Sequence, residues 1–134
     1  MSRFIGELDL RVLIGGKLWK LLKDFGYQSD RYAMTITADK DFKCDFASIP
    51  RLFWRLIGPP ATGKYRRAAI IHDWLYRLYG STGVTRKKAD GIFYEAMICD
   101  GTGHIRAWII YRAVRAGGWR PWNRYLTNSA LQRM

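Results

Sequence analysis

A histidine and two aspartates stand in apolar sequence at spacings that suit the activation of water. His72 and Asp73 are adjacent, Tyr76 follows His72 by one helical turn, and Asp90 lies further along the chain. A neutral imidazole can take a proton from water near pH 7, and a carboxylate on its other nitrogen fixes the tautomer. We therefore expect His72 to be a base, Asp90 to orient it, and the Tyr76 hydroxyl to brace Asp90.

Asp73 suits a different task, because consecutive helical residues point in directions about 100° apart. A carboxylate beside the base could hold a hard cation such as Ca²⁺, which takes six to eight oxygen ligands, many of them backbone carbonyls. The glycine- and proline-containing loop at residues 58–63 could offer those carbonyls. Asp45 is a further candidate ligand, although a turn or cap role suits it as well.

The order of sequence patterns predicts an α+β fold in one domain spanning residues 1–134. Residues 1–47 are expected to be mainly strands that form a small N-terminal antiparallel sheet. Partly alternating or β-branched sequence places these strands at residues 4–14, 17–27 and 32–38. Residues 48–118 are expected to be helical, and residues 119–134 to form an irregular, aromatic and basic C-terminal arm that ends in a short helix.

Three main helices are expected at residues 64–79, 86–99 and 105–116, and a short one near Ser48 and Pro50. Thr85 is a good N-cap for the second main helix, and glycines follow the ends of all three. His72 falls on the first main helix and Asp90 on the second. Because only a short loop joins these two helices, the His-Asp and Ala-Asp motifs should lie on adjacent antiparallel helices.

The chain carries a formal net charge of +12, which favours polyanionic partners. From residue 101 onward there are six arginines and no acidic residue. No recognised nucleic-acid motif is present, so we do not expect sequence-specific nucleic-acid binding. Arginines among tryptophans suit an anionic membrane or host envelope, or docking to other protein subunits. The expected anion-binding or interface residues are Arg112, Arg115, Trp119, Arg120, Trp122 and Arg124.

The sequence shows no targeting or membrane-spanning segment, and it contains two cysteines. No segment approaches the roughly 20 apolar residues that a membrane-spanning helix needs, and the first residues lack the apolar core of a signal peptide. We therefore expect the protein to be made in the cytoplasm of its host, with neither a signal peptide nor a transmembrane helix. Cys44 and Cys99 are expected to be free buried thiols, and their spacing from the two histidines fits no zinc site.

The motif His72-Asp73-x-x-Tyr76, followed by Ala89-Asp90-x-x-Phe93, resembles the core of the secreted phospholipase A-two superfamily. It most resembles the short form carried in parvovirus capsid proteins, where the interval between the two motifs is similarly brief. The resemblance implies that His72 is the base, Asp73 the calcium ligand, Asp90 the orienting acid and Tyr76 the brace. It also implies a calcium loop with carbonyl ligands at Ile57 and Gly58. Pro60 stands where that loop has a second glycine, and the cysteines of the secreted enzymes are missing.

A second resemblance covers residues 42–118. The segments Asp45-Phe-Ala-Ser-Ile-Pro-Arg, Ala69-Ile-Ile-His-Asp-Trp-Leu-Tyr and Phe93-Tyr-Glu-Ala-Met are similar to a family of small phage and prophage proteins of unassigned function. This resemblance implies a bacteriophage origin and no particular activity.

Two functions follow as expectations. The first is a phage-encoded, Ca²⁺-dependent, phospholipase-like esterase that acts at the host envelope and can be packaged in the virion. The alternative is a non-enzymatic virion or tail-associated structural or assembly protein. In that case His72, Asp73 and Asp90 form a buried hydrogen-bond network that only holds the helices together.

Overall fold

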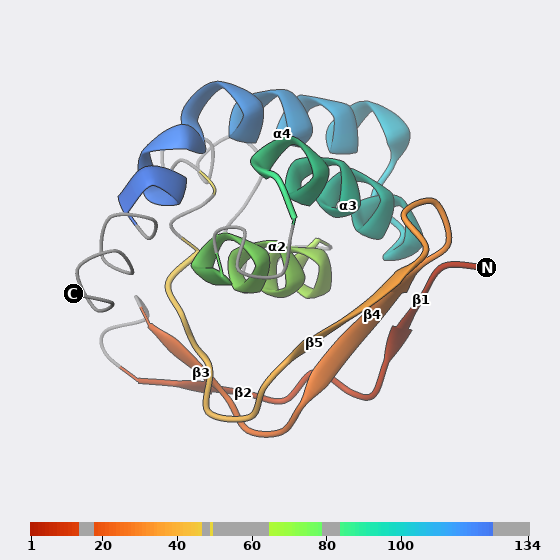
Figure 1. The fold of residues 1–134 in the computed structure, drawn as a ribbon. Helices are drawn as coiled ribbons and strands as arrows, with labels where there is room; N and C mark the ends of the chain where they lie inside the picture. Colours follow the sequence, from red (N-terminus) through yellow and green to blue (C-terminus); the bar gives the residue numbers. More distant parts are fainter. Residues whose placement is uncertain (14–17, 47–48, 50–64, 79–83, 125–134) are drawn as a thin grey trace.

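Short strands fill the first third of the chain and helices follow them, as the ribbon in Figure 1 shows. The structure is a computed structural model that describes residues 1–13, 18–46, 49, 65–78 and 84–124. The α+β order expected from the sequence is confirmed. The helix expected near Ser48 and the loop at residues 58–63 lie outside the described residues.

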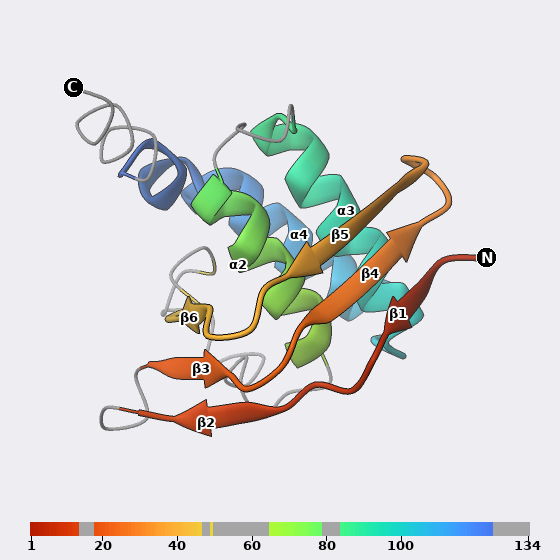
Figure 2. The same ribbon diagram turned by 60° about the horizontal axis from the view of Figure 1, so that its bottom comes forward.

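The strands form two small antiparallel sheets, where the sequence predicted one. The first sheet has the order β1-β4-β5, with β1 at Arg3–Ile5, β4 at Phe25–Ser29 and β5 at Met34–Ala38. The second has the order β2-β3-β6, with β2 at Leu10–Val12, β3 at Trp19–Leu21 and β6 at Lys43–Cys44. Figure 2 shows that the second sheet continues the first, because the chain runs from β1 into β2 and from β3 into β4.

Two of the expected strands are each divided, and this division produces the second sheet. The segment expected at residues 4–14 becomes β1 and β2, separated by a turn in which Gly6 has a φ of +85°. The segment expected at residues 17–27 becomes β3 and β4, separated by residues 22–24. A positive φ favours glycine, so Gly6 was the available signal for the first break.

The helices match their expected positions closely. Helix α2 spans Arg66–Leu78, α3 spans Arg86–Cys99 and α4 spans His104–Gly117. The Thr85 hydroxyl accepts a 3.1 Å hydrogen bond from the Lys88 amide and caps α3 as expected. Within the described residues, no helix combines the length and the apolar character needed to cross a membrane.

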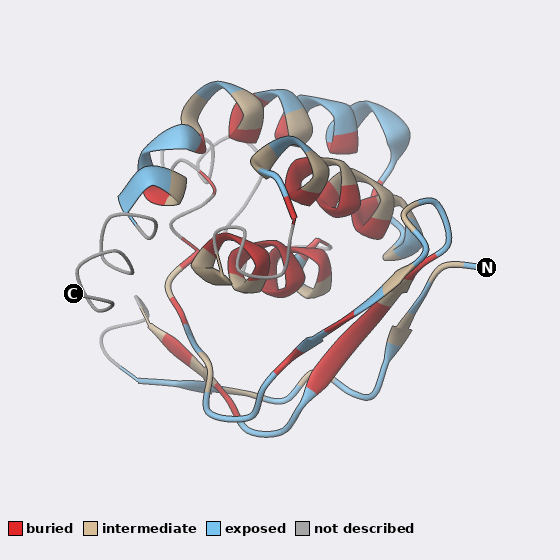
Figure 3. Ribbon diagram, viewed as in Figure 1, coloured by how far each residue is buried: buried red, intermediate tan, exposed pale blue. Residues whose placement is uncertain are grey.

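Helix α2 is the central element of the core. It contacts α3 on one side and strands β5 and β6 on the other, while α4 packs against α3. Figure 3 shows that α2 is mostly buried, with half-buried residues toward its ends, whereas α4 presents an exposed outer face. Every residue of α2 from Ala68 to Asp73 is buried, including His72 and Asp73. Buried polar groups need partners, so the position of α2 sets the chemistry of the site.

Two local expectations were wrong. The start of the C-terminal arm was expected to be irregular, but residues 119–124 are helical. Cys99 was expected to be buried, but it is exposed, while Cys44 is buried as expected. Both cysteines are free thiols.

Candidate functional site

His72 on α2 and Asp90 on α3 are in direct contact inside the protein. The His72 Nε2 atom lies 2.7 Å from Asp90 Oδ1, and both side chains are fully buried. The Tyr76 hydroxyl donates to the same carboxylate oxygen at 2.6 Å. The structure therefore brings together the three residues for which the sequence suggested base, orienting and bracing roles.

Two arginines that the sequence reasoning did not connect to Asp90 complete its surroundings. Arg115 Nη1 on α4 donates to Asp90 Oδ2 at 2.8 Å, so this arginine belongs to the cluster rather than to an exposed anion-binding face. Arg86 Nη1 lies 3.5 Å from the same oxygen and also donates to the carbonyls of Val114 and Arg115. The i,i+4 spacing of Arg86 and Asp90 on one helix was a signal that could have predicted that pair.

These donors decide the charge of Asp90. Burial raises the pKa of its carboxyl group, but the hydrogen bond and charge of His72, with further bonds from Tyr76 and Arg115, lower it more strongly. The net pKa lies below the usual value, so Asp90 is ionised at neutral pH. Burial and the neighbouring Asp90 charge raise the pKa of Tyr76, which keeps its hydroxyl protonated as a donor.

The imidazole is held in one orientation by rings as well as by Asp90. The His72 ring stacks on Phe93 with centroids 4.3 Å apart and lies 4.3 Å from the Tyr76 ring. Trp122 packs edge-on against Tyr76 at 5.2 Å, although the sequence suggested an interface role for it. Because ionised Asp90 accepts from Nε2, the lone pair of a neutral His72 is on Nδ1. The arrangement can therefore hold the tautomer that a proton-accepting histidine needs.

Asp73 lies beside this cluster and differs from every member of it. Its carboxylate is fully buried, and among the described residues no amide, hydroxyl or charged side chain donates a hydrogen bond to either oxygen, so the weak Cys44 thiol is the one donor that acts on it. Burial and the nearby Asp45 carboxylate raise its pKa to about 6, while Arg77 and the Cys44 thiol lower it only in part. A buried carboxylate without such partners is costly when ionised, so it is suited to a protonated state or to a bound cation.

The effect of Asp73 on stability should depend on pH, and this gives a test. A raised pKa means that the folded state holds the proton more tightly, so the contribution of this group to stability is lost as pH rises from about 4 to about 6. In a chelating buffer, Asp73→Asn should stabilise the protein by up to about 3 kcal/mol above pH 6 and have little effect near pH 4. Urea unfolding at both pH values measures this difference. A difference that does not change with pH would contradict the assignment.

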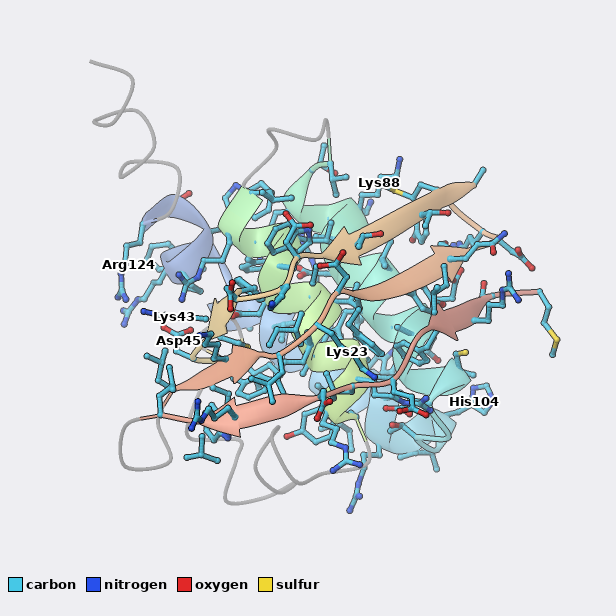
Figure 4. The ribbon with its side chains drawn as sticks, turned by 90° about the horizontal axis from the view of Figure 1, so that it is seen from below. Lys23, Lys43, Asp45, Lys88, His104 and Arg124 are labelled. Atoms are coloured by element: carbon cyan, nitrogen blue, oxygen red, sulfur yellow. The ribbon has the colours of Figure 1, made fainter. Side chains whose placement is uncertain are left out.

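The remaining candidate residues are partly separated from the cluster. Asp45 lies 3.4 Å from Arg77 Nη2, and its charge reaches Asp73. Figure 4 shows Asp45 with Lys43 and Arg124 at one side of the molecule, far from His104. Ile57 and Gly58 lie outside the described residues. Arg112, Trp119, Arg120 and Arg124 are exposed, as an interface role requires.

The residues fit calcium only through a mixed set of ligands. Among the described residues, no three histidine, cysteine or acidic side chains are grouped to hold a metal. Calcium takes many of its ligands from carbonyls and water, and a single carboxylate whose one described donor is a thiol is compatible with that pattern. Asp73 is thus the residue that would hold the ion, with Asp45 adding negative charge nearby.

Comparison with known proteins identifies the family. Residues 19–114 match the family described as "Protein of unknown function (DUF1353)". The chain belongs to this family. That range includes His72, Asp73, Tyr76 and Asp90, whereas Arg115 lies one residue beyond its end.

Two relatives from Sinorhizobium fredii (strain NBRC 101917 / NGR234) are longer than this chain. "Uncharacterized protein y4iH" is 36% identical over 116 residues, which are 86% of this chain and 47% of that protein. "Uncharacterized protein y4jT" is 31% identical over 101 residues, which are 75% of this chain and 29% of that protein. The chain thus spans half or less of the length of these relatives. No solved structure matches the chain.

Proposed function

We propose that this member of the DUF1353 family is a phage- or prophage-encoded, Ca²⁺-dependent esterase of phospholipase type. One observation carries the proposal: a buried carboxylate whose one described hydrogen-bond donor is the weak Cys44 thiol, Asp73, directly follows a histidine that Asp90 orients at 2.7 Å. A purely structural network would be expected to satisfy both carboxylates. Here Asp90 accepts hydrogen bonds from His72, Tyr76 and Arg115, whereas Asp73 has only the weak Cys44 thiol as a described donor, which leaves Asp73 suited to a cation.

The roles of the residues follow from their contacts. Asp90 accepts the Nε2 proton of His72, so in the neutral imidazole the proton-accepting lone pair is on Nδ1. Tyr76 and Arg115 hold the carboxylate of Asp90 in place, and Phe93 fixes the plane of the ring. Calcium bound at Asp73 would supply polarisation of the ester carbonyl. The imidazolium formed at His72 would be stabilised by the ionised Asp90.

The outer face of α4 supports an anionic membrane as the partner. Ile105, Trp108 and Ile109 are exposed at 81%, 55% and 44%, at spacings that place them along one side of the helix. Arg112 on α4, and Trp119 and Arg120 just after it, extend this surface with charge and a second indole. Apolar side chains flanked by arginine and tryptophan are typical of helices that lie in a membrane interface.

The experiment is release of fatty acid from vesicles that contain anionic phospholipid. The wild-type protein should release fatty acid in calcium and lose that activity in a chelator. Neutral vesicles should be poorer substrates, because the basic α4 face gains less from them. Wild-type protein that releases nothing in calcium from either kind of vesicle would refute the proposal.

A second candidate function is supported by the completeness of the burial. His72, Tyr76 and Asp90 are all 0% exposed, and Asp90 receives donors from α2, α3 and α4. Such a network can serve only to lock three helices together in a virion or assembly protein. The two functions differ in one respect: the non-enzymatic protein has no calcium-dependent activity for His72 to support.

A further inference from the structure

A pocket between α3, α4 and the β4–β5 turn combines basic and aromatic side chains. Its volume is about 350 Å³, within the range of sites for small organic ligands. None of its described lining residues is acidic, so its field favours an anion. Apart from Gly91, its lining consists of Arg31, Lys87, Tyr32, Tyr94, Trp108 and Tyr111.

Other pockets on the described surface have a different character. Two of them, of about 440 and 390 Å³, each include an aspartate and have no lysine or arginine among their described lining residues. The combination of cations and rings is therefore particular to the α3–α4 pocket within this set. Size alone does not distinguish it, so the chemistry of its walls is the informative property.

The fold makes room for this pocket at Gly91, in the middle of α3. A glycine inside a helix is destabilising relative to alanine, so its presence calls for a reason. A Cβ atom at this position would lie 2.1 Å from the hydroxyl of Tyr32, so the end of the Tyr32 side chain occupies the space that a side chain at residue 91 would take. Tyr32 is held in the β4–β5 turn by a 3.1 Å hydrogen bond from its amide to the hydroxyl of Ser29.

Cationic side chains already lie close to the rings of this pocket. Arg31 lies 5.6 Å and Lys88 5.9 Å from the centre of the Tyr32 ring. Arg112 lies 5.4 Å from the Trp108 ring. A cationic ligand would be repelled here, whereas an anion carried on a flat ring would meet both a charge partner and a stacking surface.

We propose that the α3–α4 pocket binds a nucleoside phosphate, either as a free nucleotide or as one unit of a single strand. The exposed Trp108 ring offers the stacking surface for the base, and Arg31 and Lys87 bind the phosphate. Binding of this kind is independent of base sequence. It does not depend on the proposed hydrolytic site, because His72 does not line this pocket, but it shares Trp108 with the exposed α4 face that the proposed function places at a membrane.

The test uses the full chain, a fluorescein-labelled oligothymidine followed by anisotropy, and thymidine monophosphate as the competitor. Trp108→Ala removes the stacking surface and Lys87→Ala removes a phosphate contact. Each should weaken binding about tenfold or more at moderate salt. Gly91→Ala should also weaken it, because the added methyl group displaces Tyr32. Competition by the monophosphate identifies the free nucleotide as a ligand, and oligothymidine binding without competition identifies the single strand.

Matched controls separate pocket binding from general attraction to a basic protein. Trp119→Ala removes another exposed indole, and Lys43→Ala removes a lysine on β6 that Figure 4 shows well away from Lys88. Both controls, and His72→Gln, should bind within about twofold of wild type. Equal losses in pocket and control variants, or no binding by wild type, would overturn the proposal. Pocket-dependent binding of anionic vesicles without nucleotide binding would also overturn it, in favour of a lipid headgroup site.

Discussion

Asp90→Ala should lower the free energy of unfolding by about 3–5 kcal/mol, the cost of breaking a buried ion pair by removing one partner. The substitution leaves His72, Tyr76 and Arg115 without the acceptor that each contacts at 2.6–2.8 Å. It also leaves a cavity among three helices, at a position that is fully buried from the surrounding solvent. Urea unfolding of both proteins at neutral pH measures the loss.

Two further variants serve as comparisons for the loss of stability in Asp90→Ala. Asp90→Asn keeps the shape and one acceptor, so it should cost less stability than Asp90→Ala. Asp9→Ala removes an exposed aspartate and should change stability by no more than about 0.5 kcal/mol. If Asp90→Ala melted like Asp9→Ala, the carboxylate would not hold the helices together and the description of the cluster would be wrong.

His72→Gln should reduce calcium-dependent ester hydrolysis by about 10²–10⁴-fold, the usual contribution of a general base. Glutamine can still donate to Asp90, so the helix pair should remain folded, but it cannot accept a proton from water. Asp90→Asn should also lose activity, because an amide permits the wrong histidine tautomer. Initial rates of fatty-acid release, measured at equal protein concentration, give the ratio.

A variant outside the cluster serves as the control for activity. His104 starts α4 and is exposed, so His104→Gln should retain the wild-type rate. Folding of each variant is checked by its thermal transition before rates are compared. Equal rates in wild type and His72→Gln would show that the hydrolysis, if present, does not use this histidine, and would favour the structural role of the cluster.

The helices and the pairing of His72 with Asp90 were accessible from the sequence because their signals are local. Caps, glycines and helical spacing mark α2 and α3, and the short connection between them leaves the antiparallel arrangement as the simplest one. Once both helices are placed, a histidine and an aspartate on facing buried sides have few other partners. Tyr76 follows from His72 by its spacing of one turn.

The features that the sequence did not reveal depend on distant parts of the chain. Arg115 reaches Asp90 from α4, 25 residues away, and no local pattern distinguishes it from the exposed arginines near it. The division of the N-terminal strands into two sheets depends on which strands pair, and β6 is too short to show alternation. The surroundings of Asp73 depend on Cys44 and Asp45, which come from a distant part of the chain.

Calorimetric titration with calcium tests whether Asp73 holds a cation beside His72. We expect one calcium ion bound per wild-type chain and loss of that binding in Asp73→Asn, with the fold intact in both. Asp41→Asn, which changes an exposed aspartate paired with Lys20, serves as the matched control and should bind calcium like wild type. Calcium binding that is the same in Asp73→Asn as in wild type, or no binding by wild type, would show that Asp73 does not hold calcium.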